Sequence, residues 1–256
     1  MLGIVNVTAD SFSDGGRFLD PVRAIEHGLR LRAEGADFVD VGGESTRPGA
    51  DPVPLEEELR RVLPVVEALT REGVAVSIDT MKPAVMRAAI AAGCAVVNDV
   101  NAFRAAGAID AVASAPAGLI VMHMKGAPSD MQKDPRYDDV VAEVSSFLAA
   151  RAAELEAAGV ASSRIALDPG FGFGKTVAHN KALFRALPAI AALGYPVLAG
   201  VSRKKMHGDF TGRPAAERTA GSVAAALLAV QNGASLVRVH DVKETVDAIN
   251  VWMELR

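Results

Sequence analysis

One arrangement recurs along the chain. A stretch with apolar residues at helical spacing ends in glycine, and a short apolar run then closes on a polar residue. Gly73, for example, precedes a run that ends in Asp79, and Gly159 precedes one that ends in Asp168. Glycine is favoured just past helix ends because it adopts positive φ without a Cβ penalty. Eight apolar runs occur, at residues 2–6, 38–44, 74–79, 95–99, 119–123, 165–168, 196–202 and 236–240.

The apolar runs do not alternate cleanly between apolar and polar residues, which is typical of parallel strands buried on both faces. The segments between them carry apolar stripes at helical spacing, and we expect each stripe to face a core. The stripes are Val22, Ile25 and Leu29; Leu55, Leu59, Val62, Val66 and Leu69; Val140, Val144, Leu148 and Leu155; and Val242, Val246, Ile249 and Met253. Met253 is therefore predicted to pack rather than to serve a function.

Eight strand–helix units in 256 residues predict an α/β fold, a (β/α)8 TIM barrel. The alternative is a doubly wound open sheet, which would fit six or seven strands better than eight. The chain shows no low-complexity linker and no break in composition. We therefore expect one domain over residues 1–256.

Composition narrows the class of protein. The formal net charge of -4 disfavours a general nucleic-acid surface. Cys94 is the only cysteine, which excludes an intramolecular disulfide and is typical of a reducing cytoplasm. The chain start lacks a basic segment followed by a long apolar one, and the longest apolar run, near residues 223–230, is too short to cross a membrane. We expect a cytoplasmic protein without membrane or nucleic-acid partners.

The stretch from Asp168 to Thr176 is the most distinctive loop. Gly170 and Gly174 enclose three residues, whereas a phosphate-binding P-loop needs four, and the dinucleotide fingerprint does not match either. A carboxylate, a backbone that glycine leaves open to close approach, and two phenylalanines suit a flat heterocycle with polar edges. A glycine-rich turn capped by the aspartate is the simpler alternative.

The other strand ends strengthen the functional interpretation, because the carboxyl ends of barrel strands meet at one mouth, where active sites lie. The polar residues at these ends are Asn6, Glu44, Asp79, Asn98, His123, Asp168, Ser202 to Lys204, and Arg238 to His240. Asp79 and Thr80 could instead cap the following helix, and His123 is best interpreted as a core histidine with its hydrogen bonds satisfied. Residues 7–17 and 43–52 are long enough to act as lids.

The mouth is predicted to bind two kinds of group. Basic residues after the last two strands suit an anion, since these loops form the usual phosphate corner of the fold. Arginine there can bind phosphate oxygens bidentately. Asp79, Asn98 and Asp168 suit a ring with N–H donors, because carboxylates accept hydrogen bonds from such edges.

Taken together, these motifs resemble dihydropteroate synthase over nearly the whole chain. The matching stretches are Asn6 to Gly16, Gly43 to Ala50, Ser77 to Thr80, Val97 to Asp99, Met122 to Met124, Asp168 to Lys175, Ser202 to Lys205 and Arg238 to Val242. The resemblance implies that p-aminobenzoate is joined to 6-hydroxymethyl-7,8-dihydropterin diphosphate, with release of dihydropteroate and diphosphate. It also implies Mg²⁺ as cofactor and a homodimer.

The resemblance implies a role for each matching residue. The residues implied to bind the pterin are Asp79, Asn98, Met122, Asp168 and Lys204. The residues implied to bind the diphosphate or to form the loop that covers it are Asn6, Thr46, Arg47, Arg238 and His240. Asn6 is also implied to bind Mg²⁺. Aminobenzoate, with which sulfonamides compete, falls to Pro48, Phe173 and Lys205. Catalysis is assigned to Asp79, Lys204, Arg238 and His240.

Three features depart from the family pattern. Ala9 stands where proline is usual and His207 where an aliphatic residue is usual. The chain begins at the first predicted strand, so we expect the N-terminal extension that usually covers the barrel floor to be largely absent. Two other functions remain open: a methyltetrahydrofolate-dependent methyltransferase, which has no use for the anion corner, and a non-catalytic pterin-binding paralogue.

Overall fold

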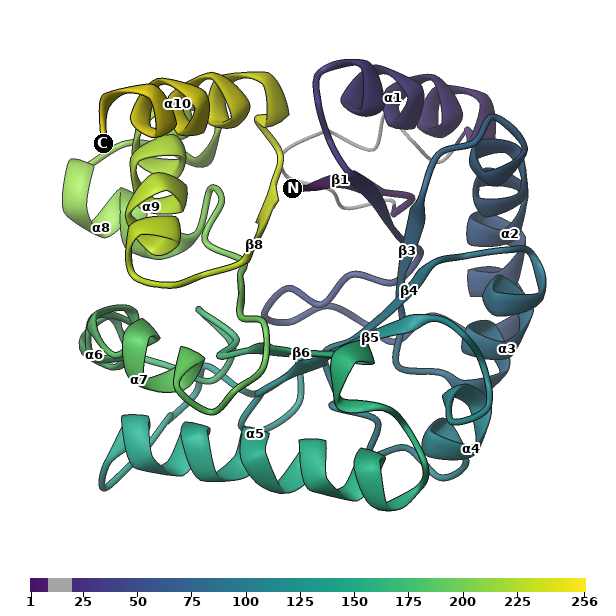
Figure 1. Cartoon of the computed structure of the whole chain (residues 1–256), viewed down its shortest axis with the longest axis horizontal. Coiled ribbons are helices and arrows are strands. Elements are labelled where there is room, and N and C mark those ends of the chain that lie inside the picture. Colours follow the sequence, from purple (N-terminus) through teal and green to yellow (C-terminus); the bar gives the residue numbers. More distant parts are fainter. Residues whose placement is uncertain (9–19) are drawn as a thin grey trace.

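Eight parallel strands form one sheet in the computed structural model, which describes residues 1–8 and 20–256. The strands are β1 (Leu2–Asn6), β2 (Phe38–Gly42), β3 (Val76–Asp79), β4 (Val96–Asp99), β5 (Gly118–Met122), β6 (Ile165–Asp168), β7 (Leu198–Ala199) and β8 (Leu236–Val239). Their order is β6-β5-β4-β3-β2-β1-β8-β7. A parallel bridge between Leu167 and Val197 joins the two end strands and closes the ring. The predicted (β/α)8 barrel is therefore confirmed, and the open-sheet alternative is wrong (Figure 1).

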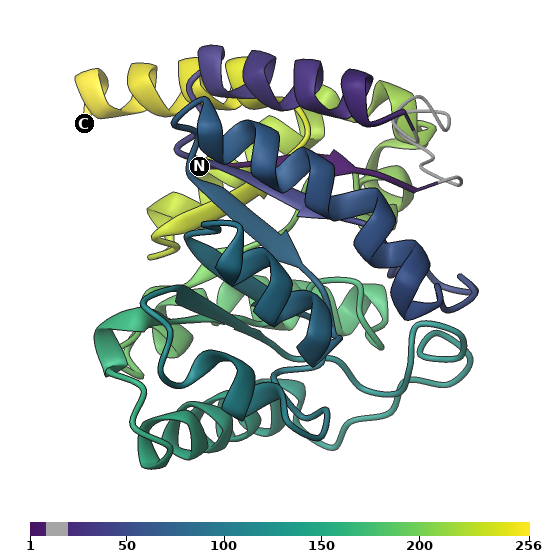
Figure 2. The same ribbon diagram turned by 90° about the vertical axis from the view of Figure 1, so that its right-hand side faces the viewer.

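Helices surround the ring of strands on its outside (Figures 1 and 2). They are α1 (Pro21–Ala33), α2 (Leu55–Arg71), α3 (Pro83–Ala91), α4 (Ala108–Val112), α5 (Val140–Ala157), α6 (Val177–Arg185), α7 (Leu187–Ala191), α8 (Lys205–Thr211), α9 (Thr219–Gln231) and α10 (Val242–Leu255). Short 3-10 turns, η1 (Ser162–Arg164) and η2 (Ala215–Glu217), precede β6 and α9. None of the described helices is long and apolar enough to cross a membrane.

The predicted stripe of α1 is wrong at two of its three positions, although Ile25 is half-buried and packs against the main core. Val22 is 60% exposed and Leu29 is 37% exposed, whereas Ala24, Gly28 and Leu31 are buried. The reason is close packing: a Cβ on Gly28 would lie 2.8 Å from Leu69 Cδ1 of α2. Small residues therefore form the contact face, and larger apolar residues lie beside it.

The other stripes are mostly correct. Val62, Val66 and Leu69 of α2 are buried, and so are all four predicted positions of α5. The prediction for Met253 is wrong, because this side chain is 51% exposed near the end of α10. Its helix begins against the barrel at the buried Val242 and projects past it at the C-terminus (Figure 2).

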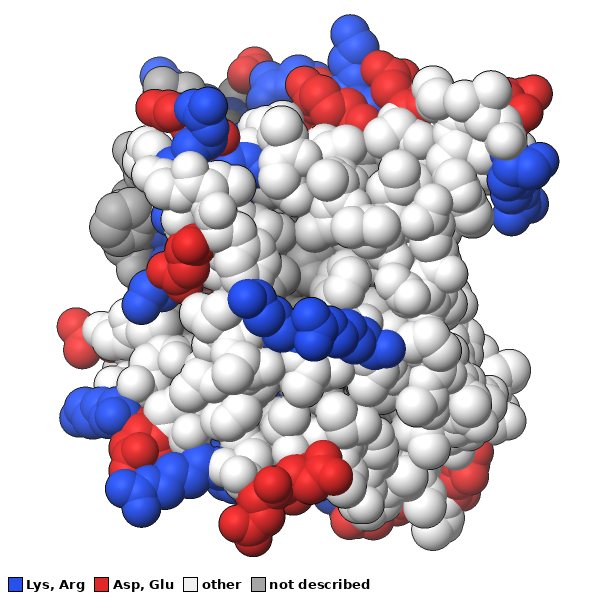
Figure 3. Space-filling model, turned by 90° about the vertical axis from the view of Figure 1, so that its left-hand side faces the viewer, with Lys and Arg blue, Asp and Glu red and all other residues white. Residues whose placement is uncertain are grey.

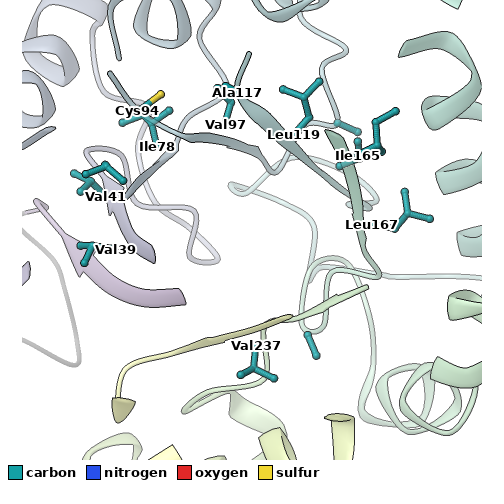
Figure 4. Close-up of a cluster of buried hydrophobic side chains, with 14 of the residues drawn as sticks. Val39, Val41, Ile78, Cys94, Val97, Ala117, Leu119, Ile165, Leu167 and Val237 are labelled. Atoms are coloured by element: carbon teal, nitrogen blue, oxygen red, sulfur yellow. The ribbon is translucent and has the colours of Figure 1, made fainter. Parts of the chain in front are cut away.

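Alternation along the strands separates two layers of side chains. Val39, Val41 and Ile78 point outward into the main core between sheet and helices (Figure 4). Since successive strand residues face opposite sides, Asp40, Ser77 and Asp79 point into the barrel. A small apolar cluster that includes Leu2, Ile120, Ala166 and Leu198 fills the barrel interior. Polar interior residues thus begin above this cluster, toward the carboxyl ends of the strands.

Candidate active site

Most of the predicted pterin residues lie at one end of the barrel. Asp79, Met122 and Asp168 are the last residues of β3, β5 and β6, and Asn98 is next to last in β4. The strand register places Asp79 beside Asn98, and Met122 beside Asp168. Asn6 ends β1 at the same mouth. The parallel sheet therefore brings these side chains together as expected.

Arg238 connects two acids across the interior. Its Nε donates to Asp40 Oδ2 at 2.5 Å, and its Nη2 donates to Asp79 Oδ2 at 2.9 Å. Asp40 lies in the middle of β2 and is fully buried. Asp79 does not cap α3, whose N-cap residue is Lys82, but Thr80 Oγ1 accepts a hydrogen bond from Lys82 N at 3.2 Å just before that helix. Neither bond uses Nη1 of Arg238.

The ionisable groups at the mouth perturb one another. Burial raises the pKa of Asp79 to about 7, an effect that Arg238 opposes and the Asp40 charge reinforces. Burial also raises the pKa of Asp168, whose Oδ1 accepts a hydrogen bond from Gly170 N at 2.7 Å. The pKa of Lys204 falls to about 8, first through burial and then through Arg238. Perturbed ionisable groups that lie together in this way are typical of functional sites.

Two glycines of the β6–α6 loop are required by a neighbouring loop. A Cβ on Gly170 (φ 68°) would collide with the His123 carbonyl oxygen, and one on Gly174 (φ 62°) with that of Lys125. The close approach predicted for these glycines is therefore to protein backbone. The central Gly172 instead lies against the side chain of Lys204.

Lys175 fixes the same loop from within. Its buried ammonium contacts His123 Nδ1 at 2.9 Å and the carbonyl oxygens of Gly170 and Phe173, each at 2.9 Å. Burial and then the charge of Lys175 lower the pKa of His123 to about 3, so this imidazole is neutral and accepts through Nδ1. His123 is thus a satisfied core histidine, as the sequence predicted.

The loop presents one aromatic face to the mouth. Lys204 Nζ lies 4.3 Å from the centre of the Phe173 ring, a cation–π contact. Phe173 also packs against a methionine-rich cluster of Val100, Met122, Met124 and Met131. Met122 therefore belongs to an apolar wall beside Asn98 and Asp168, and polarizable thioethers pack well against flat rings.

The loop after β4 is held from both sides. Asp99 accepts hydrogen bonds from Asn101 N and Phe103 N, both at 2.7 Å. Arg151 of α5 donates to the carbonyl oxygens of Ala102 (2.9 Å) and Phe103 (3.1 Å). Ala102 and Phe103 both have φ 56°, a left-handed conformation that is costly for residues other than glycine. These contacts fix the strand end that carries Asn98.

His240 lies in a cationic corner. Burial, then the charges of Arg203, Arg238, Arg47 and Lys204, lower its pKa well below the ordinary value. Ser202 Oγ accepts from His240 N at 3.2 Å and lies 3.0 Å from Nδ1. Ser202 therefore holds both the backbone and the imidazole of His240. These positive charges lie together at the place where the sequence predicts an anion site.

Two contacts shape the segment between β7 and α8. Arg203 (φ 53°) pairs with Asp241 at 2.6 and 3.1 Å. His207, buried in α8, contacts the Val201 carbonyl oxygen through Nε2 at 2.6 Å. This contact explains how an imidazole is accommodated at position 207.

The loop after β2 lies over the mouth. Gly49 N donates to Pro128 O at 3.0 Å, which ties this loop to the one after β5. Below it, Lys82 pairs with Glu44 and with the buried Glu58, so Glu44 anchors the loop. The charge of Arg47 helps to lower the pKa of His240. Thr46 is half-buried in this loop, and Pro48 is exposed.

Other predicted positions are more peripheral or undescribed. Lys205 is exposed at the first position of α8, one residue beyond Lys204. Most of the predicted lid at residues 7–17, with Ala9, lies outside the described residues.

The protein oxygen atoms at the mouth suit Mg²⁺ only if a bound ligand supplies further oxygen atoms. Among residues 1–8 and 20–256, no group of three or more His, Cys, Asp or Glu side chains could hold a metal ion. Asn6 supplies one amide oxygen at the mouth. Mg²⁺ commonly takes one or two protein oxygens and completes its shell with water and substrate phosphates. The residues present fit that mode of binding.

The barrel is closed and parallel, and its strand-end acids, cationic corner and apolar wall meet at one mouth. These features define a barrel enzyme that acts on a polar ring compound. Residues 2–240 match the family described as pterin binding enzyme. The dihydropteroate synthase of Neisseria meningitidis serogroup C is 52% identical over 100% of this chain and 92% of its own length. That of Escherichia coli K12 is 46% identical over 98% of this chain and 89% of its own.

Solved structures agree with the sequence relatives. A Yersinia pestis dihydropteroate synthase with a sulfonamide drug superposes with a TM-score of 0.97 at 44% identity, covering 100% of this chain and 93% of that one. A Xanthomonas albilineans dihydropteroate synthase with 4-aminobenzoic acid gives 0.92 at 55%, covering 99% and 92%. The chain thus belongs to the pterin-binding enzymes, and among them to the dihydropteroate synthase family.

The sequence interpretation missed Asp40 and Lys175. The sequence does contain an indication for Asp40. A lone carboxylate inside an apolar strand must have a buried partner. The indication for Lys175 is weaker, because in the sequence a lysine that follows three glycines cannot be told from an exposed lysine of an ordinary loop.

Proposed function

We propose that this protein joins p-aminobenzoate to 6-hydroxymethyl-7,8-dihydropterin diphosphate, forming 7,8-dihydropteroate and releasing diphosphate. One observation carries the proposal: acids and cations from β3, β6, β7 and β8 meet at one mouth and shift one another's pKa values. A ring with N–H donors and a diphosphate together match this mixture of charges. A Xanthomonas albilineans dihydropteroate synthase has been solved with 7,8-dihydropteroate, which supports the same product here.

The pterin role falls to the acidic side of the mouth. Asp79, Asn98 and Asp168 supply oxygen atoms for the N–H groups of the ring, and Met122 supplies an apolar surface beside them. Lys204 lies between Phe173 and the acids and carries an ammonium of lowered pKa. A carbonyl oxygen of the ring is the natural partner for that ammonium.

The diphosphate role falls to the cationic corner. Arg238 keeps Nη1 outside its two carboxylate bonds, and His240 lies close enough for the Arg238 charge to lower its pKa. Arg47 adds its charge from the loop above, with Thr46 beside it. Fixed donors of this kind stabilise the charge that develops as diphosphate leaves.

Mg²⁺ is proposed as the cofactor, held by Asn6 together with diphosphate oxygens. When bound, Mg²⁺ neutralises charge on the leaving group. The chain's own contribution is to orient the ring through Asp79 and Asp168 and to limit water with the loop after β2.

The aminobenzoate role falls to the outer rim. Phe173 supplies a ring face under Lys204, whereas Pro48 lies exposed on the loop after β2 and Lys205 lies exposed at the first position of α8. This position suits the second substrate, because it leaves the deeper acids to the pterin. The sulfonamide complex of the Yersinia pestis relative supports a sulfonamide-binding site here as well.

The direct test is turnover with both substrates and Mg²⁺. We expect diphosphate and dihydropteroate in equal amounts, and no product when p-aminobenzoate is omitted. Asp168→Ala is the matched inactive variant, because an unpaired N–H edge in a buried pocket loses its binding energy. Tight pterin binding without product would identify a non-catalytic paralogue and overturn the proposal.

We also propose a homodimer in the cytoplasm. Several exposed apolar residues support the dimer: Phe210 of α8, Leu228 of α9, and Val251, Met253 and Leu255 of α10. The side of the molecule where α6, α8 and α9 lie is largely uncharged, apart from a basic stripe across it (Figure 3). Exposed apolar residues on a face with few charges support an interaction site there. The single buried cysteine supports a reducing compartment.

A further inference from the structure

The connection from β5 to α5 contacts a loop on each of its sides. On one side Pro128 O accepts a hydrogen bond from Gly49 N at 3.0 Å, in the loop after β2 that carries Pro48. On the other side the connection meets the β6–α6 loop that carries Phe173. We call residues 125–137 of this connection the bridging segment. It touches both loops to which the proposed function assigns aminobenzoate (Figure 2).

The bridging segment holds the carbonyl groups on either side of Phe173. Gln132 Nε2 donates to Gly172 O, and Tyr137 Oη donates to Gly174 O at 2.9 Å. Gly172 and Gly174 have φ 82° and 62°, and glycine has more backbone freedom than any other residue. A phenylalanine between two glycines is only weakly fixed by its own backbone. The two side-chain bonds therefore restrict where its ring points.

The bridging segment is itself held in place. Lys125 Nζ lies 4.1 Å from the centre of the Tyr137 ring, and the His179 ring packs edge-on against it with centres 4.9 Å apart. Burial raises the pKa of Tyr137, so its hydroxyl keeps the proton that it donates. Met131 is buried in the methionine-rich cluster against which Phe173 packs. The segment thus contacts Phe173 both through side chains and through the neighbouring backbone.

The direction of the Phe173 ring matters for an aromatic ligand. Aromatic rings pair favourably in offset-stacked or edge-to-face arrangements, so a turned ring loses part of the contact. Gln132 is exposed, and one hydrogen bond from an exposed side chain adds little to the stability of a fold. The main effect of the Gln132 contact is therefore on the loop that it joins.

We propose that Gln132 and Tyr137 are positioning residues for the second substrate. They hold Phe173 in the direction that a flat aryl amine requires, and the bridging segment sets the spacing between the Phe173 and Pro48 walls. This inference rests on the proposed function and adds to it a connection whose residues that function does not use.

Gln132→Leu and Tyr137→Phe each remove one donor, and Tyr137→Phe keeps the ring that contacts Lys125. We expect each to raise the KM for p-aminobenzoate about two- to tenfold, as for one lost neutral hydrogen bond. The KM for the pterin substrate should stay at the parental value, and so should the urea midpoint of Gln132→Leu. Lys133→Leu is the matched control, because it makes a similar change at the next exposed position.

A double-mutant cycle with Phe173→Ala tests whether these residues act through Phe173. Gln132→Leu and Tyr137→Phe combined should raise the KM for p-aminobenzoate about fivefold or more in the parent protein. In the Phe173→Ala background the same pair should change it by less than about twofold, because the ring that they position is gone.

The second wall has its own test. Asp130 Oδ1 accepts from Ala127 N at 2.9 Å and closes the turn that presents the Pro128 carbonyl group. Asp130→Ala loosens this turn and should raise the KM for p-aminobenzoate about two- to fivefold. Asp130→Asn keeps an acceptor oxygen and should retain the parental KM. Equal increases for the two variants would overturn the role of the segment in spacing the walls.

The outcomes separate this inference from the proposed function. If the parent protein forms no dihydropteroate, the proposed function fails and the inference fails with it. If the parent turns over while Gln132→Leu and Tyr137→Phe keep the parental KM for p-aminobenzoate, only the positioning role is overturned. It is also overturned if these variants raise the KM values of both substrates equally, or if the pair acts undiminished in Phe173→Ala.

Discussion

Nη2 of Arg238 donates to Oδ2 of Asp79 at 2.9 Å, although the two residues lie 159 positions apart. The contact links the last strand of the barrel to the third. It places an acid with a pKa of about 7 beside a permanent cation. The charge of Asp79 therefore changes near neutral pH, within reach of the ligand.

Pterin binding should depend on this proton. An ionised Asp79 accepts ring N–H groups, so affinity should rise as pH increases through about 7 and fall again as Lys204, whose pKa is about 8, loses its proton. The sign follows from the raised pKa, because below it the protonated acid must lose its proton before it can accept. Calorimetric titrations across this range measure the effect. Asp79→Asn should bind more weakly and lose the rise, and a variant that keeps it would assign the titration to another group.

Gly170→Ala should strongly destabilise the protein. The new Cβ would collide with the His123 carbonyl oxygen, and φ 68° adds left-handed strain. We expect a loss of roughly 3 kcal/mol or more in the free energy of unfolding. Gly73→Ala is the matched control, because φ is 72° and nothing lies within 4 Å of its Cβ. It should cost only about 1 kcal/mol. Equal losses in urea unfolding would refute the close-approach argument.

Arg151→Met should weaken pterin binding from a distance. Without the two guanidinium bonds to Ala102 and Phe103, the strained loop can relax and move Asn98. We expect a several-fold higher KM for the pterin substrate, with the KM for p-aminobenzoate little changed. Adding Ala102→Gly should restore much of the loss, because glycine adopts φ 56° without strain. Glu154→Gln leaves the carbonyl contacts intact and serves as the control. Failure of Ala102→Gly to rescue would show that strain is not what Arg151 restrains.

Leu228→Glu should separate the proposed dimer. A charge placed in an apolar contact is left without water or a partner, which costs several kcal/mol. Light scattering should show half the mass of the parent protein. Leu29→Glu places the same charge at an exposed leucine of α1 and should leave the mass unchanged. A parent protein that is already monomeric would exclude the dimer.

Thermal unfolding should show one heat-capacity peak for the whole chain. β1 pairs with both β2 and β8, so the two ends of the chain share one sheet. Cooperative loss of that sheet predicts a single transition. Two resolved peaks would contradict the one-domain organisation predicted for residues 1–256.

The arrangement of the strand ends was accessible from the sequence. Apolar runs that end in Asp79, Asn98 and Asp168 predict parallel strands, and parallel strands place their carboxyl ends on one edge. The rule is local and repetitive, so each unit could be read without its neighbours. The buried faces of the helices were harder to predict from the sequence. α1 packs through Ala24 and Gly28, and such small residues contribute little to an apolar pattern.

Partner choice was decided only by the closed barrel. The bond from Arg238 to Asp40 joins residues 198 positions apart, and no spacing rule relates them. The cation that faces Phe173 and the carbonyl oxygens that require glycine at 170 and 174 likewise depend on which loops meet. Periodicity determines which way a side chain points, whereas ring closure determines what it meets there.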